Sequence, residues 1–242
     1  MTIFDAWAGL ALPVCCVLLL IVGALQTPGK RHARVAREGG TIFLGEAIMH
    51  WGYAWIDRLA RVALKLGLSA TAVSWLSLFL GLASGLGMAW GHFGLAAWLL
   101  TLSGLGDGMD GAMARQQGNA SRAGAVLDSA LDRYVEFFFL MGVIYFYRGV
   151  VGVQLLALVA LFGGFMVTYS TAKAEALQVT PPRGWMKRAE RLVWLIGGAT
   201  LASALPLAGH SGHPILVAVL ALIAIMSNLS AIIRLIALSR SV

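Results

Sequence analysis

The sequence predicts an all-α integral membrane protein. Of its 242 residues, 59% are hydrophobic and only 12% are charged, whereas roughly 25% of the residues in a soluble domain are charged. The mean hydropathy is +0.81. The apolar residues form long continuous stretches rather than the short alternating segments of a transmembrane β-barrel. We therefore expect a bundle of membrane-spanning helices.

Seven apolar stretches approach the length of about 20 residues that a helix needs to cross a bilayer. They are residues 7–26, 72–89, 94–112, 123–147, 151–172, 192–209 and 214–238. Basic residues gather after the first, third and fifth stretches and at the end of the chain. Because positive charge remains on the cytoplasmic side, we expect the N-terminus outside and the C-terminus inside.

The net charge of +7 raises the alternative of a nucleic-acid-binding protein. The basic residues, however, follow the alternation of the loops and do not form a single patch. The sequence therefore predicts membrane lipid as its surroundings and no nucleic-acid partner.

The chain divides into two predicted domains. Residues 1–45 comprise an N-terminal transmembrane anchor and a basic cytoplasmic linker, since the first stretch has neither the basic start nor the A-x-A end of a signal peptide. Residues 46–242 form the main domain. It opens with residues 46–66, where apolar residues recur at helical spacing beside tryptophans and arginines. This pattern predicts an amphipathic helix in the membrane interface, although a plain connecting helix fits it about as well.

Four of the six aspartates lie in one short part of the chain. Asp107 and Asp110 are three residues apart, and Asp128 and Asp132 are four apart. Each spacing puts both carboxylates on one face of a helix. The segment between the pairs contains Gly and Asn, which predicts a break between two helices. The two pairs are therefore expected to meet where two neighbouring spans end.

Carboxylates gathered at a membrane surface repel one another and need a cation beside them. Oxygen ligands suit Mg²⁺ or Mn²⁺, so the four aspartates predict a two-metal site that acts on a phosphate or diphosphate. Gly111 allows a large group to approach the backbone, and Gly124 leaves room beside Asp128. Arg115 lies one turn beyond Gly111, where it could bind a phosphate with two hydrogen bonds.

The pattern Asp107-x-x-Asp110-Gly111-x-x-Ala114-Arg115, eight residues, Gly124-x-x-x-Asp128-x-x-x-Asp132 resembles the motif of the CDP-alcohol phosphotransferase (CDP-alcohol phosphatidyltransferase) family. All of the fixed positions are present with their spacing. The resemblance covers about residues 46–240 and implies a six-helix bundle, to which the N-terminal span is an addition.

The resemblance implies an enzyme of phospholipid synthesis. It would transfer a phosphatidyl group from CDP-diacylglycerol to the hydroxyl of a polar alcohol and release CMP, with two Mg²⁺ or Mn²⁺ ions. It also implies a homodimer. We expect the active site to face the cytoplasm, with a bacterial inner membrane as the location.

Residue roles follow from the same resemblance. Asp107, Asp110 and Asp128 are expected to bind metal, and Asp132 to bind the second metal and act as the general base. The expected donor contacts are Gly111, Arg115, Ser121, Gly124, Thr71 and Ser74. The family's P-N-x-x-T pattern before the first core helix lacks its Pro and Asn here.

Two later segments bear on the acceptor. Lys173, Arg188 and Arg191 resemble residues that bind an acceptor phosphate in phosphatidylinositol-phosphate synthases and their archaeal relatives. Thr171 stands where that pattern has an arginine, so one phosphate contact is lost or supplied otherwise. Inositol 1-phosphate is the predicted acceptor, with glycerol 3-phosphate or an unphosphorylated alcohol as alternatives.

Two other classes also gather carboxylates in a membrane. An intramembrane prenyltransferase usually carries its aspartate motifs on well-separated helices, which this sequence does not. A cation transporter should hold its carboxylates at mid-membrane, whereas these lie beside a charged loop.

Overall fold

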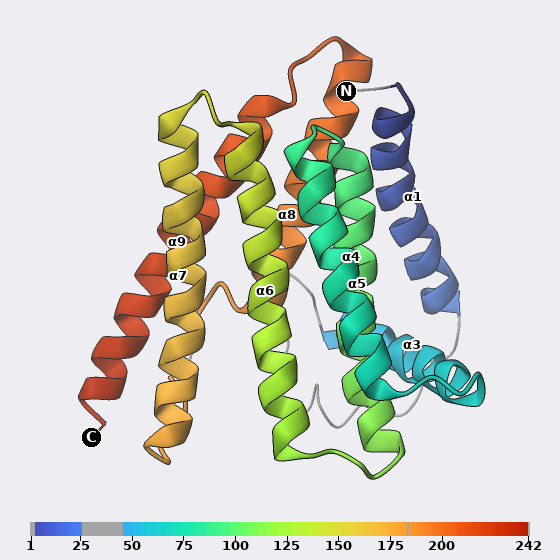
Figure 1. Ribbon diagram of the computed structural model, residues 1–242, viewed down its shortest axis with the longest axis vertical. Coiled ribbons are helices and arrows are strands. Elements are labelled where there is room, and N and C mark those ends of the chain that lie inside the picture. The colour runs from blue at the N-terminus through green and yellow to red at the C-terminus, as the bar shows by residue number, and fades with distance from the viewer. Residues whose placement is uncertain (1–2, 26–45, 183, 242) are drawn as a thin grey trace.

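The computed structural model describes residues 3–25, 46–182 and 184–241, and within them the secondary structure is entirely helical (Figure 1). The helices are α1 (Ile3–Leu25), α3 (Glu46–Lys65), α4 (Ala70–Ala89), α5 (Phe93–Gln116), α6 (Arg122–Phe146), α7 (Val151–Ala176), α8 (Arg188–Ala204), the short 3₁₀ helix η1 (Leu205–Ala208) and α9 (His213–Ser239). The predicted all-α fold is confirmed. The linker predicted before residue 46 lies outside the described residues.

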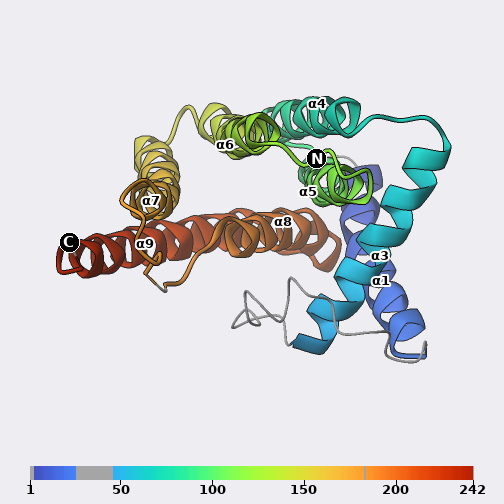
Figure 2. The same cartoon turned by 90° about the horizontal axis from the view of Figure 1, so that it is seen from below.

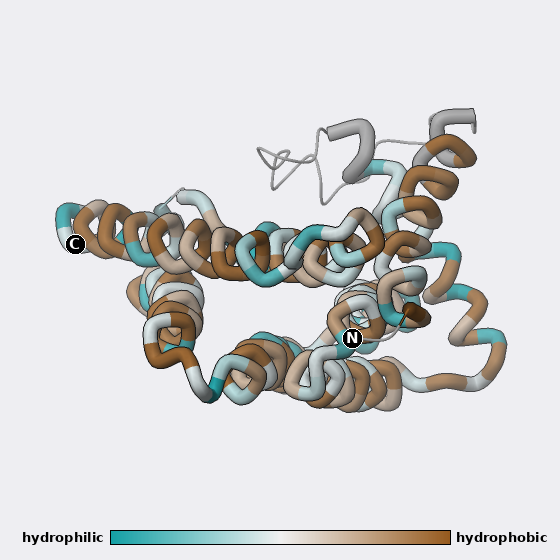
Figure 3. Tube along the Cα trace, turned by 90° about the horizontal axis from the view of Figure 1, so that it is seen from above, coloured by the Kyte–Doolittle hydropathy of each residue, from teal (hydrophilic) through white to brown (hydrophobic). Residues whose placement is uncertain are grey.

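Six of the seven predicted apolar stretches fall within single helices, to within one residue, and the stretch 192–209 is divided between α8 and η1. Among the described residues, four helical segments are long and apolar enough to cross a membrane: α4, α7, α8 with η1, and α9. Helices α5 and α6 are as long but carry the aspartates. The outer surface is strongly apolar, with Phe79, Phe162 and Ile225 each at least 60% exposed, and apolar residues recur along the outside of the helices (Figure 3). The protein is an integral membrane protein, since lipid is the solvent that such a surface requires.

Glycines bring α4 and α6 into backbone contact. A Cβ atom at Gly85 would overlap the carbonyl oxygen of Phe138, and one at Gly142 would overlap the carbonyl oxygen of Gly85. Small residues allow helix backbones to approach this closely inside a membrane. Helix α4 is also joined to α5 by two reciprocal bonds, in which the hydroxyls of Ser77 and Ser103 each donate to the other's carbonyl oxygen at 3.0 and 2.7 Å.

Helix α1 packs against α5 and α8 as an additional helix of the bundle (Figure 1). The Asp5 carboxylate accepts a hydrogen bond of 3.0 Å from the backbone N–H of Leu95, in the first turn of α5. The Trp98 indole donates to the carbonyl oxygen of Ala8 at 2.8 Å. The predicted N-terminal helix is therefore present and docked, while its role as a separate anchor domain stays a prediction.

Helix α3 runs across the helices of the bundle, beside the lower part of α5 and below the end of α1 (Figures 1 and 2). Ala60 and Ala63 are buried against Val73 of α4 and Met113 of α5. The exposed side carries basic and apolar residues next to each other, namely Arg58, Arg61, Lys65, Leu59, Val62 and Leu66. This helix has the amphipathic composition that the sequence predicts for residues 46–66.

Candidate active site

The turn between α5 and α6 brings the two aspartate pairs together. Gly118 has a φ of +68°, a left-handed conformation that a residue with a side chain seldom adopts. The Ser121 hydroxyl caps α6 by accepting a hydrogen bond of 3.0 Å from the N–H of Gly124. The predicted helix break is thus confirmed, and Ser121 serves it as a cap.

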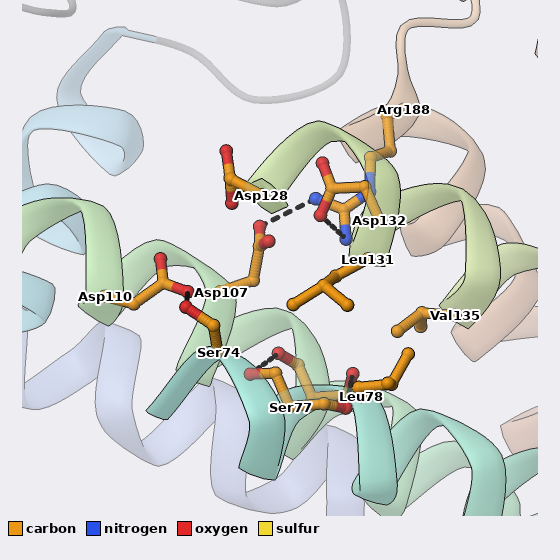
Figure 4. A pocket seen from close by; sticks show the side chains of 11 residues that line it. Ser74, Ser77, Leu78, Asp107, Asp110, Asp128, Leu131, Asp132, Val135 and Arg188 are labelled. Atoms are coloured by element: carbon orange, nitrogen blue, oxygen red, sulfur yellow. Dashed lines mark hydrogen bonds and ion pairs between the residues drawn. The ribbon is translucent and has the colours of Figure 1, made fainter. Parts of the chain in front are cut away.

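Asp107, Asp128 and Asp132 converge from α5 and α6 (Figure 4). Each offers one carboxylate oxygen, and these oxygens all lie within 4.8 Å of one another. At this separation the three oxygens could hold one divalent ion after small movements of the side chains. In addition, Oδ1 of Asp132 is buried without a hydrogen-bond donor among the described residues. The three carboxylates therefore fit a divalent metal.

Asp110 lies at the edge of this cluster and is 5% exposed. Its Oδ2 accepts a hydrogen bond of 2.5 Å from the hydroxyl of Ser74 on α4. Both residues line the same pocket as the other aspartates, but no oxygen of Asp110 belongs to the three-carboxylate cluster. Thr71, one turn earlier on α4, is exposed.

Arg188 enters the site from the first turn of α8. Its Nη1 lies 2.6 Å from Oδ2 of Asp107, and its Nη2 lies 2.6 Å from Oδ1 of Asp132. The first contact is also a hydrogen bond, whereas the second is an ion pair without hydrogen-bond geometry, as the orphaned Oδ1 shows. With the guanidinium in place the pocket has about 10 Å³ free, roughly the space of one water molecule.

The predicted donor contacts lie along the outer edge of the site. Arg115 is exposed near the end of α5, and its Nη1 would be 3.2 Å from a Cβ atom at Gly111. A Cβ atom at Gly124 would lie 3.2 Å from the Ser121 hydroxyl. The guanidinium of Arg115 therefore covers Gly111, one turn from the aspartates.

The structure separates the three residues predicted to bind the acceptor phosphate. Arg188 reaches the aspartates, and Lys173 is exposed near the end of α7. Arg191 is only 2% exposed, and all three of its guanidinium nitrogens are engaged. They bind the Glu136 carboxylate and the carbonyl oxygen of Met186. The structure therefore does not bring Arg191 to the site, because an internal carboxylate already holds its charge.

The sequence alone assigns no role to one further cation, Arg234 of α9. It is 4% exposed, and its Nη1 donates to the Thr171 hydroxyl at 3.3 Å. Its Nε and Nη2 are buried without a hydrogen-bond partner among the described residues. A Cβ atom at Gly184 would overlap Nε. The available signal was the arginine itself, because a charge inside an apolar span is costly and seldom without a function.

The fold and the site define a class of membrane enzyme. The sequence profile of CDP-alcohol phosphatidyltransferases matches residues 67–240, and the chain belongs to this family. It is therefore a transferase of phospholipid biosynthesis. Family membership excludes the prenyltransferase and the cation transporter as alternatives.

Several proteins of known name are similar to the chain. Archaetidylinositol phosphate synthase of Methanothermobacter thermautotrophicus is 33% identical over 153 residues, which cover 63% of this chain and 73% of that protein. Phosphatidylinositol phosphate synthase of Mycobacteroides abscessus is 34% identical over 113 residues, which cover 46% of this chain and 49% of that protein.

Among solved structures, the phosphatidylinositol phosphate synthase of Mycobacterium tuberculosis in complex with manganese and citrate matches with a TM-score of 0.69 and 28% identity, over 76% of this chain and 88% of that one. The structure of the same enzyme with CDP-DAG bound matches with a TM-score of 0.68 and 27% identity, over 76% of this chain and 92% of that one. The fold prediction is thus confirmed by solved structures as well.

Proposed function

We propose that the protein transfers the phosphatidyl group of CDP-diacylglycerol to a hydroxyl of inositol 1-phosphate and releases CMP. The observation that carries this proposal is the convergence of Asp107, Asp128 and Asp132 with Arg188, which places a cation-binding cluster beside an anion-binding group. The named relatives support the acceptor, since they are an archaetidylinositol phosphate synthase and a phosphatidylinositol phosphate synthase.

The four aspartates of the motif would hold two divalent ions, Mg²⁺ or Mn²⁺. Asp107, Asp128 and Asp132 would supply the converging oxygens. Asp110, held by its hydrogen bond to Ser74, would supply a further ligand. Bound metal would neutralise the diphosphate of the donor and stabilise the leaving CMP. The mycobacterial enzyme solved in complex with manganese and citrate supports a divalent ion for this chain as well.

Asp132 is proposed as the general base. Its Oδ1 is paired with Nη2 of Arg188 at 2.6 Å but accepts no hydrogen bond among the described residues, which leaves it able to accept a proton from the acceptor hydroxyl. The hydroxyl oxygen then bonds to the phosphorus that carries the diacylglycerol, and the bond from that phosphorus to the bridging oxygen breaks. CMP leaves with the bridging oxygen, and the proton remains on Asp132.

The donor is proposed to lie over the outer edge of the site. Arg115 is exposed there and would bind the diphosphate, its guanidinium lies over Gly111, and the exposed Gly124 leaves the backbone accessible. Ser121 and Ser74 would contribute by fixing the α5–α6 turn and Asp110. Thr71 is exposed at the start of α4 and completes the expected set.

The acceptor phosphate is proposed to bind between Arg188 and Arg234, with Lys173 nearby. Arg234 has buried N–H groups left to donate, and it contacts Thr171 directly. It can therefore supply the phosphate contact that Thr171, in place of an arginine, cannot make. Arg191, although predicted for this role, is held by Glu136.

We further propose that the enzyme is a homodimer in a bacterial inner membrane, with the site facing the cytoplasm. The support is the placement of basic residues at the site's end of the bundle and the properties that the family resemblance implies. Cross-linking in native membranes and cysteine labelling from either side would test these points.

The function is tested by measuring CMP release from CDP-diacylglycerol with Mg²⁺ or Mn²⁺. The acceptor panel is inositol 1-phosphate, glycerol 3-phosphate, inositol, serine and none. We expect release that depends on inositol 1-phosphate. A preference for glycerol 3-phosphate would keep the reaction but reassign the acceptor, and a preference for free inositol would exclude a phosphate subsite at Arg188 and Arg234.

A further inference from the structure

Two ion pairs join α6 to the first turn of α8. Asp132 pairs with Arg188, and Glu136 pairs with Arg191. Asp132 and Glu136 are four residues apart on α6, while Arg188 and Arg191 are three apart on α8. Because both spacings correspond to about one helical turn, the second pair lies directly below the first and deeper in the bundle.

The deeper pair has a defined geometry. Nε of Arg191 lies 2.5 Å from Oε1 of Glu136, and Nη2 lies 2.7 Å from Oε2, so the carboxylate is bound by two parallel bonds. Glu136 is 6% exposed and Arg191 is 2% exposed. A buried ion pair contributes little net stability compared with apolar residues of the same size. Its value lies in fixing how the two helices meet.

The same arginine also holds the loop before α8. Its Nη1 donates to the carbonyl oxygen of Met186 at 2.7 Å. Met186 has a φ of +53° and is 2% exposed, and a long side chain rarely adopts this left-handed conformation without support. Arg188 follows two residues later. Arg191 therefore determines both the helix position and the path of the chain that enters it.

Helix α7 leaves space for this arrangement. A Cβ atom at Gly164 would lie 2.9 Å from both Nε of Arg191 and Oε1 of Glu136. Neither atom can move away cheaply, because each is part of the buried bidentate pair. Glu136, Arg191 and Gly164 thus form one unit drawn from three helices, with no substrate-facing group among them.

We propose that Glu136 and Arg191 are positioning residues that set the reach of Arg188 toward the aspartates and the acceptor. The part that concerns the acceptor rests on the proposed function. The pair fixes the first turn of α8 against α6, so that the Arg188 guanidinium lies over Asp107 and Asp132. Loosening the pair weakens acceptor binding through Arg188 and leaves the donor side unchanged.

The test is a double-mutant cycle on the full-length enzyme. We expect Glu136→Gln to raise the KM for inositol 1-phosphate about tenfold, with the KM for CDP-diacylglycerol changed by less than about twofold. In an Arg188→Ala background the same substitution should raise the acceptor KM by less than about twofold, because residues that act through one another are not additive. An equal fold-change in both backgrounds would show a general structural role and overturn the proposal.

Arg191→Lys keeps the charge but loses the bidentate geometry. This variant replaces Glu136→Gln in the experiment if Glu136→Gln does not fold. It should produce the same selective rise in acceptor KM. The matched control is Arg148→Lys, an exposed arginine at the opposite end of α6, which should match the wild type. An unchanged acceptor KM in folded Arg191→Lys would also contradict the proposal.

A second readout does not require turnover. Arg188 contacts two of the carboxylates that fit a metal, so its positive charge opposes a divalent ion there. Mn²⁺ titration followed by electron paramagnetic resonance should show tighter binding in Arg188→Ala and, to a smaller extent, in Glu136→Gln. If Arg188→Ala binds Mn²⁺ more tightly and Glu136→Gln does not, then Glu136 does not position Arg188, and the proposal is overturned. This measurement remains decisive even if the wild type uses a different acceptor and the proposed function fails.

Discussion

The hydroxyl of Ser74 lies 2.5 Å from Oδ2 of Asp110 and joins α4 to α5 at the buried edge of the site. Asp110 is the one motif aspartate that lies outside the three-carboxylate cluster. Ser74 therefore decides where this carboxylate points, although it belongs to a helix that carries none of the motif.

Ser74→Ala should lower turnover by a factor of about 10 to 10², because the loss of a hydrogen bond to a charged group costs about 1.5–3 kcal/mol. Ser74→Thr keeps the hydroxyl and should retain most of the activity. The comparison of kcat between the two variants checks the prediction. Equal activity of Ser74→Ala and the wild type would show that the Ser74 hydroxyl does not contribute to turnover.

Asp132→Asn should reduce CMP release by at least a factor of about 10², which is the lower range of general-base catalysis. Donor binding should persist, since the amide is similar in shape and Asp107 and Asp128 remain. Turnover and equilibrium binding of CDP-diacylglycerol are measured on the same preparation. Preserved turnover would exclude Asp132 as the base.

Arg234→Met should weaken acceptor binding and leave stability equal or higher. The variant removes a buried guanidinium that has two nitrogens without partners among the described residues, and burying an unpaired polar group is unfavourable. The acceptor KM and the thermal unfolding midpoint should therefore both rise. A fall in both activity and unfolding temperature would instead assign Arg234 a structural role.

Gly142→Ala should destabilise the bundle by at least about 1–3 kcal/mol, because overpacking forces the α4 and α6 backbones apart. A Cβ atom there overlaps the carbonyl oxygen of Gly85. Gly197→Ala in α8 is the matched control, since a Cβ atom at Gly197 meets nothing within 4 Å. This control should gain about 0.5–1 kcal/mol. Thermal unfolding in detergent compares the two.

The sequence was sufficient to predict the helices and the meeting of the aspartates. Asp107 and Asp128 belong to two helices joined by a short turn, so their spacing alone brings them together. Asp110 was harder to place, because its partner Ser74 lies 36 residues away on another helix.

The roles of three arginines could not be predicted from the spacing of residues along the chain. Arg188 and Arg191 looked alike in the sequence, but Glu136, 55 residues earlier, binds only the second of them. Nothing in the segment around Arg191 indicates that partner. Arg234 has no neighbouring motif at all, and only the packing of α9 against α7 brings it to Thr171.

The docking of α1 has a consequence for biogenesis. Its Asp5 accepts a hydrogen bond from Leu95, and a Cβ atom at Gly9 would overlap the hydroxyl of Ser203 in α8. Helix α1 therefore has binding partners that lie about 90 residues (Leu95) and nearly 200 residues (Ser203) further along the chain. The docking surface of α1 is therefore covered only after α5 and α8 have been inserted beside it.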